Sequence, residues 1–142
     1  MKTKVLVSAC LLGQCCKYNG GHNYAPKVEA FLKDKIPVLI CPEVMAGLGV
    51  PRTPIEIVDG VVMDRQGNNV DPQIRSAVAQ VLELVRKEQI TCAVLKSRSP
   101  TCGARQVYDG TFSGTLIDGA GVLAQALMNA GLQVLDSEEL NR

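Results

Sequence analysis

Three cysteines of the sequence each follow an apolar run of strand length, and their thiols could bind one metal centre. They are Cys10 after residues 5–7, Cys41 after residues 38–40, and Cys102 in the turn-rich segment that follows residues 92–95. Soft sulfur ligands select zinc, copper(I) or iron–sulfur clusters. The alternative for each cysteine is packing, because Cys is among the residue types most often buried. If all three meet at one edge of a sheet, a metal centre is the better explanation.

The spacing of the cysteines leaves the kind of metal centre open. The sequence has no Cys-x-x-Cys pair and one histidine, His22, so a structural zinc site with close ligand pairs is not expected. Three ligands suit either a catalytic zinc with an open position or a cubane cluster with one iron free of protein. Cys92 lies within an apolar run and is expected to pack in the core. Cys15 and Cys16 are adjacent, so either could be an extra thiol or simply a loop residue.

Two polar residues close to these cysteines could take part in catalysis. Glu43 follows Cys41 by two positions, and a carboxylate beside a metal cleft can act as a general acid or base. Ser99 precedes Cys102 by three positions, where its hydroxyl could orient a substrate or relay a proton. Each has a simpler interpretation, a solvated loop glutamate for the first and a turn-capping serine for the second.

Cations and aromatic residues flank the same segments and could bind a substrate. The cations are Arg52, Lys96, Arg98 and Arg105. They could bind a carbonyl or phosphate oxygen, or be solvated. Tyr18 and Tyr24 are the aromatic residues nearest to Cys10 in the sequence, and either ring could stack on a flat heterocycle. Tyr18, Arg52 and Lys96 are the substrate-binding candidates.

The elements that must position these residues alternate between strands and helices. Strands are predicted at residues 4–9, 37–40, 90–95 and 132–135. One helix is predicted to begin at Pro26, a second to follow the N-cap Asp71 and reach residue 85, and a third to span residues 121–130. This alternation predicts an open, mostly parallel, Rossmann-like α/β sheet with right-handed crossovers. Ligands of such sheets bind outside the carboxyl ends of the strands, which is where the three cysteines belong.

Three long segments and one hairpin complete the predicted architecture. Residues 55–63 alternate around Asp59-Gly60, which predicts a β-hairpin with a two-residue type I′ turn. Residues 10–24 and 41–54 are predicted as loops, and residues 96–119 as a loop-rich segment. Loops of this length within a small domain are candidates for function.

The composition is that of one folded domain spanning residues 1–142. Hydrophobic residues make up 46% and charged residues 20%, and the net charge is +1, so the sequence has no overall electrostatic footprint for nucleic acid or an anionic membrane. We find no signal peptide or membrane span near the N-terminus and expect a cytoplasmic protein. In that compartment six cysteines are expected to be ligands, catalytic thiols or core residues rather than disulfides.

A set of short motifs runs over nearly the whole chain. They are VSACLLG at residues 7–13, KYNGGH at 17–22, CPE at 41–43, GL at 47–48, PR at 51–52, SPTCG at 99–103 and YDGTFSG at 108–114. Taken together they resemble the thiouracil desulfurase family. The resemblance implies a [4Fe–4S] cluster held by Cys10, Cys41 and Cys102, with one iron open to the substrate's sulfur. It also implies that Glu43 and Ser99 are the catalytic carboxylate and hydroxyl.

The expected function is therefore the non-redox desulfuration of a thiolated pyrimidine, thiouracil or a small thionucleoside, to uracil and sulfide. Desulfuration of 4-thiouridine in transfer RNA is an alternative. A nucleic acid partner is not favoured, because the chain has little aromatic content and almost no net charge. Three further functions compete with desulfuration: a zinc hydrolase, a non-catalytic carrier of a cluster or of sulfide, and a plain nucleotide-binding module.

Overall fold

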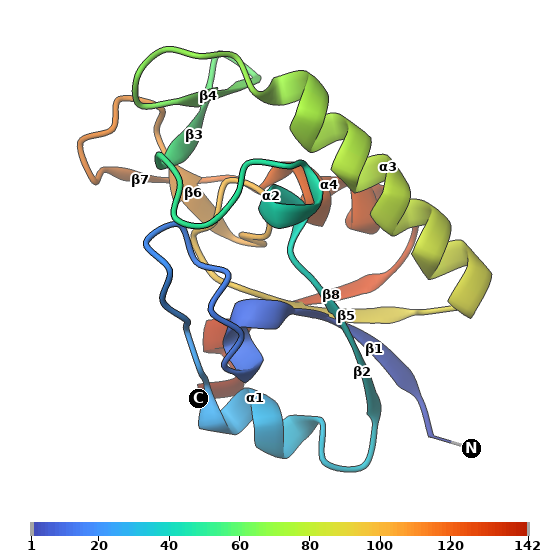
Figure 1. The fold of residues 1–142 in the computed structure, drawn as a ribbon. Coiled ribbons are helices and arrows are strands. Elements are labelled where there is room, and N and C mark those ends of the chain that lie inside the picture. Colours follow the sequence, from blue (N-terminus) through green and yellow to red (C-terminus); the bar gives the residue numbers. More distant parts are fainter. Residues whose placement is uncertain (1, 142) are drawn as a thin grey trace.

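A parallel sheet of four strands runs through the middle of the protein (Figure 1). The computed structural model describes residues 2–141. The strands are β1 (Lys4–Ser8), β2 (Ile36–Ile40), β5 (Cys92–Leu95) and β8 (Gln133–Asp136), in the order β2-β1-β5-β8. Each neighbouring pair is parallel. The predicted α/β class with a mostly parallel sheet is therefore confirmed.

Helices cover both faces of this sheet. They are α1 (Pro26–Phe31), α2 (Pro42–Met45), α3 (Asp71–Glu88) and α4 (Val122–Asn129), with the 3₁₀ helices η1 (Ala9–Leu12) and η2 (Ser137–Asn141). Figure 1 shows α3 and α4 on one side of the sheet and α1 on the other. None of the helices within residues 2–141 combines the length and the apolar character that a membrane-spanning segment needs.

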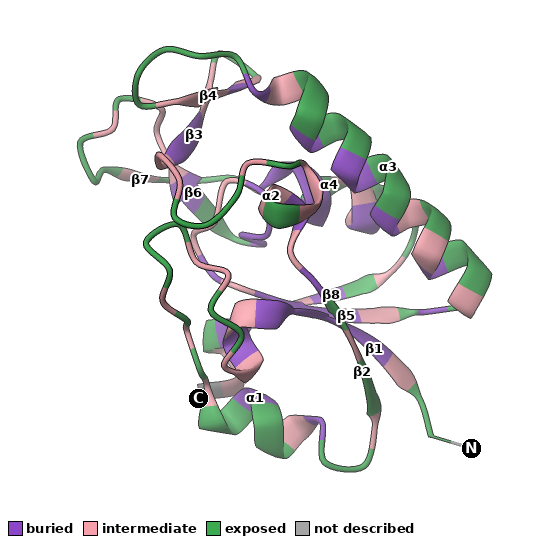
Figure 2. Ribbon diagram, viewed as in Figure 1, coloured by how far each residue is buried: buried purple, intermediate pink, exposed green. Residues whose placement is uncertain are grey.

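The core has two parts because successive side chains of a strand point to opposite faces. Leu6 of β1 belongs to the cluster that includes the buried face of α3, whereas Val5 and Val7 pack in a second cluster with Val28 of α1. Figure 2 shows this burial along the central strands. In α3 the buried residues recur at helical spacing, as predicted: Ile74, Ala77, Val78, Val81 and Val85.

Two hairpins lie beside the sheet (Figure 1). The predicted one is formed by β3 (Ile55–Val58) and β4 (Val61–Asp64), and Asp59 and Gly60 both have positive φ, as a type I′ turn requires. The second, β6 (Gln106–Tyr108) and β7 (Leu116–Asp118), occupies part of the segment predicted as loop-rich. Strands of three residues are too short to produce a recognisable alternation, so the sequence pattern did not reveal them.

Other differences from the predicted elements are small. The helices η1 and α2 lie in segments predicted as loops, because a single turn of helix has no periodic pattern. The helix α3 begins at Asp71 with Val70 as its N-cap, one residue from the prediction. Instead of capping the helix, the Asp71 carboxylate accepts a hydrogen bond from the Val62 amide at 3.0 Å and joins β4 to α3.

Candidate active site

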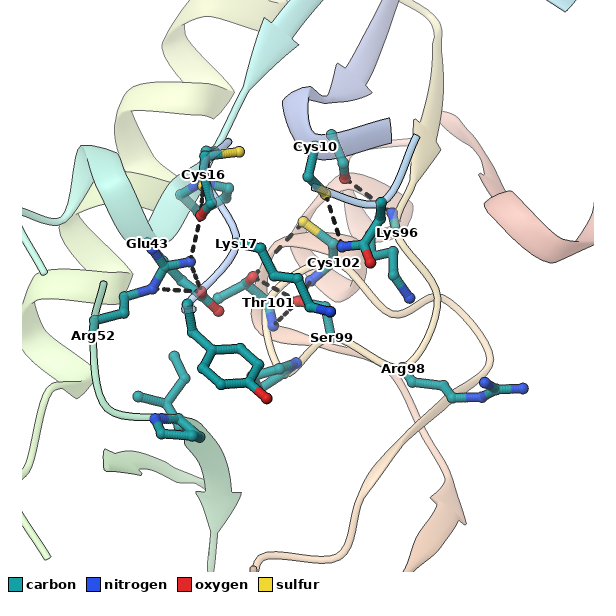
Figure 3. A pocket seen from close by; sticks show the side chains of 18 of the residues that line it. Cys10, Cys16, Lys17, Glu43, Arg52, Lys96, Arg98, Ser99, Thr101 and Cys102 are labelled. Carbon is teal, nitrogen blue, oxygen red and sulfur yellow. Dashed lines mark hydrogen bonds and ion pairs between the residues drawn. The ribbon is translucent and has the colours of Figure 1, made fainter. Parts of the chain in front are cut away.

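A cavity of about 470 Å³ lies where three neighbouring parallel strands end (Figure 3). Its size falls within the usual range of small-molecule sites. Cys10 reaches it from η1 after β1, Cys41 follows β2 directly, and Cys102 lies in the turn after β5. Because β1 lies between β2 and β5, the three strand ends adjoin and their thiols line one cavity. The predicted convergence of these thiols at the carboxyl edge of the sheet is confirmed.

The three thiols form a donor set that fits an iron–sulfur cluster. All three cysteines are free, and Cys102 is only 4% exposed. Burial raises the pKa of the Cys10 thiol, and the nearby Cys41 contributes to the shift through charge repulsion. Within residues 2–141, no three His, Cys, Asp or Glu side chains are grouped so that they could hold one metal ion. A cluster allows wider spacing, because each thiolate binds a different iron.

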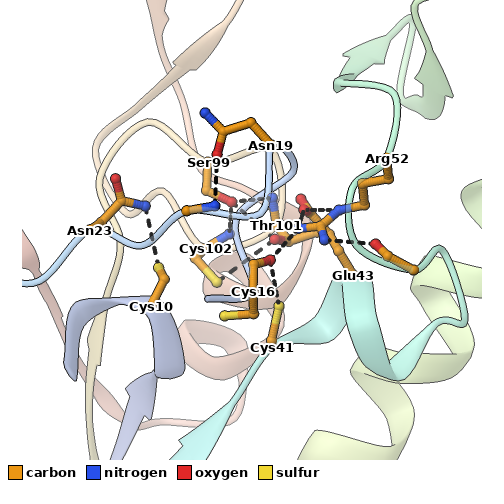
Figure 4. Close-up of polar contacts among 12 residues, drawn as sticks. Cys10, Cys16, Asn19, Asn23, Cys41, Glu43, Arg52, Ser99, Thr101 and Cys102 are labelled. Carbon is orange, nitrogen blue, oxygen red and sulfur yellow. Dashed lines mark hydrogen bonds and ion pairs between the residues drawn. The ribbon is translucent and has the colours of Figure 1, made fainter. Parts of the chain in front are cut away.

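Two side chains donate hydrogen bonds to these sulfurs (Figure 4). The Asn23 amide donates to Cys10 Sγ at 3.4 Å, and the Thr101 hydroxyl donates to Cys102 Sγ at 3.7 Å. Such contacts orient metal-binding side chains and adjust their donor strength. Sequence reasoning missed Asn23, which lies in a segment without periodic pattern.

The remaining cysteines differ in their relation to the cavity. Cys16 lines it, and its pKa is raised to about 12, chiefly by burial and then by the charge of Cys41 and a hydrogen bond to Cys41. The Cys41 thiol in turn lies 3.8 Å from the Cys16 carbonyl oxygen. Cys15 is exposed and is not part of the cavity wall. Cys92 packs against the core cluster of α1, as predicted.

Glu43 lies in the cavity wall as half of a buried ion pair. Cys41 is the N-cap of α2 and Pro42 its first residue, which places Glu43 in the first turn beside the thiol. The Glu43 side chain is 14% exposed and that of Arg52 is 6% exposed. Arg52 donates to Glu43 Oε2 from Nη2 at 2.5 Å and from Nε at 3.0 Å. Glu43 is therefore not a solvated loop residue.

Ser99 shapes the turn that carries Cys102. Its Oγ accepts hydrogen bonds from the amides of Thr101 at 3.2 Å and Cys102 at 3.0 Å, and it lies 3.0 Å from Thr101 Oγ1. The turn-capping interpretation is thus correct, and the hydroxyl lines the cavity as well. The turn is tight enough to need a glycine, because a Cβ on Gly103 would lie 2.8 Å from the Ser99 carbonyl oxygen.

All eight residues that the sequence predicted for the site line this cavity: Cys10, Tyr18, Cys41, Glu43, Arg52, Lys96, Ser99 and Cys102. Burial lowers the pKa of Lys96, whose Nζ donates to the Ser97 carbonyl and hydroxyl oxygens. Tyr18 is 42% exposed and lies at the rim. Arg98 also lines the cavity but points away from the thiols and pairs with Glu138 (Figure 3).

The wall opposite the thiols comes from the two hairpins, and sequence reasoning did not identify it. Glu56 of β3 is buried, and its Oε1 accepts hydrogen bonds from the Gly110 amide at 3.0 Å and the Phe112 amide at 3.2 Å. The guanidinium of Arg65 lies 6.0 Å from the centre of the Phe112 ring. Glu56 lies in β3, Arg65 follows β4, and Gly110 and Phe112 share the loop between β6 and β7, so no spacing rule links these three segments.

The metal-free protein is expected to lose stability as the pH rises above 9. Burial is the main cause that raises the pKa of Cys102 from 9.0 to about 12. The unfolded chain then releases this proton at a lower pH than the folded chain does. The free energy of unfolding should therefore fall between those values, by at most about 1.4 kcal/mol per pH unit for this thiol.

Melting temperatures of the metal-free wild type and of Cys102→Ser, taken from about pH 8 to about pH 11, test this linkage. The variant should show the smaller decline, because its hydroxyl does not ionise in this range. Equal declines would contradict the role of the Cys102 thiol in the alkaline loss of stability.

Comparisons with known proteins show the family of this chain. The model of the 2-thiouracil desulfurase family matches residues 5–139. The uncharacterized protein YbbK of Bacillus subtilis (strain 168) is 35% identical, over 96% of this chain and 97% of its own length. A solved structure described as the [4Fe–4S]-dependent thiouracil desulfidase TudS superposes with a TM-score of 0.92 at 33% identity, over 99% of this chain and 94% of that chain. The chain therefore belongs to the 2-thiouracil desulfurase family.

Proposed function

We propose that this protein is an enzyme that hydrolyses the C–S bond of a thiolated pyrimidine such as thiouracil, giving uracil and sulfide. The observation that carries the proposal is the meeting of three free thiols and the Glu43 carboxylate at one cavity. The similar structure described as a [4Fe–4S]-dependent thiouracil desulfidase supports it. The reaction exchanges the thiocarbonyl sulfur for the oxygen of one water, and no net electron transfer is needed.

Cys10, Cys41 and Cys102 would hold a [4Fe–4S] cluster, and the fourth iron, which has no protein ligand, would supply a Lewis acid for the substrate's sulfur. The similar structure described as a [4Fe–4S]-dependent thiouracil desulfidase favours this cofactor over the single metal ion of a zinc hydrolase. Asn23 and Thr101 would orient two of the ligands through their hydrogen bonds to sulfur.

Glu43 is the residue best placed to move a proton. Its Oε2 is held by Arg52, and among residues 2–141 no hydrogen bond to Oε1 is formed. Oε1 can therefore accept a proton from the water that attacks the thiocarbonyl carbon, and it can return that proton to the departing product. A general base of this kind typically accelerates a reaction about 10²–10⁴-fold.

Other side chains would bind and orient the pyrimidine ring. The Tyr18 ring at the rim offers a stacking surface, and the half-buried Lys96 ammonium offers a donor for the exocyclic carbonyl oxygen of the pyrimidine. The Ser99 oxygen already accepts two amide hydrogens, so its own hydrogen is the group that it can give to Thr101 or to the substrate. The cavity has room for a base or a small nucleoside, and a net charge of +1 gives the chain no overall electrostatic attraction for transfer RNA.

Replacing Ser99 with alanine is expected to lower both turnover and stability. The kcat should fall about 100-fold if the hydroxyl relays a proton. The Thr101 and Cys102 amides would lose their acceptor, which should lower the melting temperature by about 2–4 °C. Kinetics and thermal melts of Ser99→Ala beside Ser76→Ala, on the exposed face of α3, measure both effects. An unchanged kcat with a lowered melting temperature would restrict Ser99 to capping the turn.

Anaerobic reconstitution followed by turnover tests the proposed function. We expect about four irons and four sulfides per chain, and release of sulfide from 2-thiouracil or 4-thiouracil in equal amount to uracil. Stoichiometric zinc without iron would overturn the proposal in favour of a hydrolase. A full cluster without turnover of any thiolated base or nucleoside would point to a carrier, and faster desulfuration of thiolated transfer RNA would show that the preferred substrate is larger.

A further inference from the structure

The guanidinium of Arg52 is almost fully occupied by acceptors of the protein. Its Nε and one Nη2 hydrogen go to Glu43 Oε2, the other Nη2 hydrogen goes to the Cys16 carbonyl at 2.9 Å, and Nη1 donates to the Gly49 carbonyl at 3.0 Å. These contacts use four of the five N–H groups that an arginine has. With a side chain only 6% exposed, Arg52 has little left to offer a substrate.

The contacts of Arg52 fix one oxygen of the Glu43 carboxylate and leave the other free. Both N–H contacts end on Oε2, on the side of the carboxylate that faces Arg52 (Figure 4). Glu43 follows Cys41 by two residues in the first turn of α2, and it lines the same cavity as Cys10 and Cys102. The free oxygen thus belongs to a carboxylate that is held in place close to the proposed cluster ligands.

Arg52 also joins the segments that form this side of the cavity. Its side chain reaches the carbonyls of Cys16 and Gly49, and its backbone amide donates to the Tyr18 carbonyl at 2.6 Å. The loop that carries Cys16 and Tyr18 is thereby tied to α2, which carries Glu43 (Figure 3). A planar, multiply donating guanidinium can make this set of contacts, whereas a lysine ammonium is a single point of charge.

We propose that Arg52 is a positioning residue that holds Glu43 for proton transfer, and that it does not bind the substrate. This inference rests on the proposed function, and it reassigns a residue that the sequence suggested for substrate binding. Arg52 acts by fixing Oε2, so that Oε1 is presented to the attacking water in one orientation. Its removal should impair the chemical step and leave ring binding intact, because misplacing a catalytic group by about 1 Å can cost about 100-fold in rate.

The test compares Arg52→Gln and Arg52→Lys with the wild type in the iron-loaded enzyme. We expect Arg52→Gln to lower kcat about 100-fold, with KM for thiouracil and the dissociation constant of uracil within about threefold of the wild type. Arg52→Lys should recover part of kcat, because it keeps the charge but not the fork of donors. The matched control is Arg75→Gln, which should leave kcat unchanged. Arg75 also pairs with a carboxylate, that of Asp71 on α3, and donates to the Gly60 carbonyl.

A double-mutant cycle with Glu43→Gln shows whether Arg52 acts through Glu43. If it does, Arg52→Gln/Glu43→Gln will be no slower than Glu43→Gln alone, because the carboxylate to be positioned is already lost. If the losses of kcat in the two single variants multiply in the double variant, the proposal is overturned. It is also overturned if Arg52→Gln keeps a normal kcat but raises KM and the uracil dissociation constant tenfold or more. Loss of iron or of folding in both single Arg52 variants would show a structural role and would overturn it too.

Failure of this inference can be told apart from failure of the proposed function. Sulfide release by the wild type decides the function without any variant. Uracil affinity, measured by calorimetry on wild type and Arg52→Gln, decides whether Arg52 contacts the ring even if the preferred thiolated substrate is another pyrimidine. A tenfold weaker affinity in Arg52→Gln would count against the positioning role in either case.

Discussion

Replacing Cys102 with serine is expected to abolish iron binding and desulfuration together. Cys102 is 4% exposed and lies at the cavity in a turn that Ser99 fixes. No neighbouring side chain can therefore move into the position of its sulfur without disturbing this turn. A cluster held by three thiolates loses a third of its protein ligands with this change. Iron and acid-labile sulfide after anaerobic reconstitution should fall to background, and no sulfide should be released from thiouracil.

Two other cysteines provide matched controls for this result. Cys15→Ser changes an exposed thiol next to the site, and Cys92→Ser changes a half-buried thiol that packs against the α1 side of the sheet. Both variants should keep iron and turnover, since neither thiol lines the cavity. Melting of the metal-free variants shows whether each one folds. A folded Cys102→Ser protein with a full cluster and normal turnover would refute the ligand assignment.

The sequence was sufficient to predict where the site lies because its position depends on regular elements. The apolar runs that become β1 and β5 are continuous, as buried parallel strands require, and the helix α3 has an unambiguous period. The run that becomes β2 is apolar as well, although this strand lies at the edge of the sheet and is largely exposed. Once strands and helices alternate, right-handed crossovers bring the carboxyl ends of the strands to one edge. Cys10 and Cys41 follow from this geometry, because each lies within two residues of the end of its strand, whereas the place of Cys102 also depends on the turn that Ser99 caps.

The wall of the site could not be predicted in the same way, because irregular segments build it. The pair of Glu43 and Arg52 joins a single turn of helix to a loop, and Glu56 reaches the amides of Gly110 and Phe112 more than fifty residues away. Such contacts depend on backbone paths that no periodic pattern encodes. Glu43 and Arg52 were each found near the site, but the sequence suggested two separate roles where the structure pairs them.

Cys16 is another residue whose place in the cavity wall could not be predicted from the sequence pattern. Adjacent to Cys15 in sequence, it could not be distinguished from its neighbour by residue type or spacing. The structure separates the two, since Cys16 lines the cavity beside Cys41 and Cys15 is exposed. The path of one loop decides which thiol enters the site, and the tie between the Cys16 carbonyl and Arg52 is part of that path.

Replacing Glu43 with glutamine is expected to stop catalysis while the cluster and the binding of uracil persist. Glutamine keeps the shape of the side chain and an oxygen for Arg52, but its amide cannot take a proton from water. A general base contributes about 10²–10⁴-fold, so kcat should fall about 1,000-fold. Single-turnover sulfide release, iron content and uracil affinity, measured on one preparation, separate the chemical step from cofactor loading and from binding.

The comparison with Glu43→Asp tests whether a carboxylate is what the reaction needs. Aspartate retains the proton acceptor but is one methylene shorter, so it should recover some kcat over the glutamine variant without reaching the wild type. Glu83→Gln removes an exposed carboxylate of α3 that also pairs with an arginine, and it should change neither iron content nor rate. Near-normal turnover in Glu43→Gln would exclude Glu43 as the proton acceptor. Ser99, whose hydroxyl lines the same cavity, would then be the next candidate to move the proton.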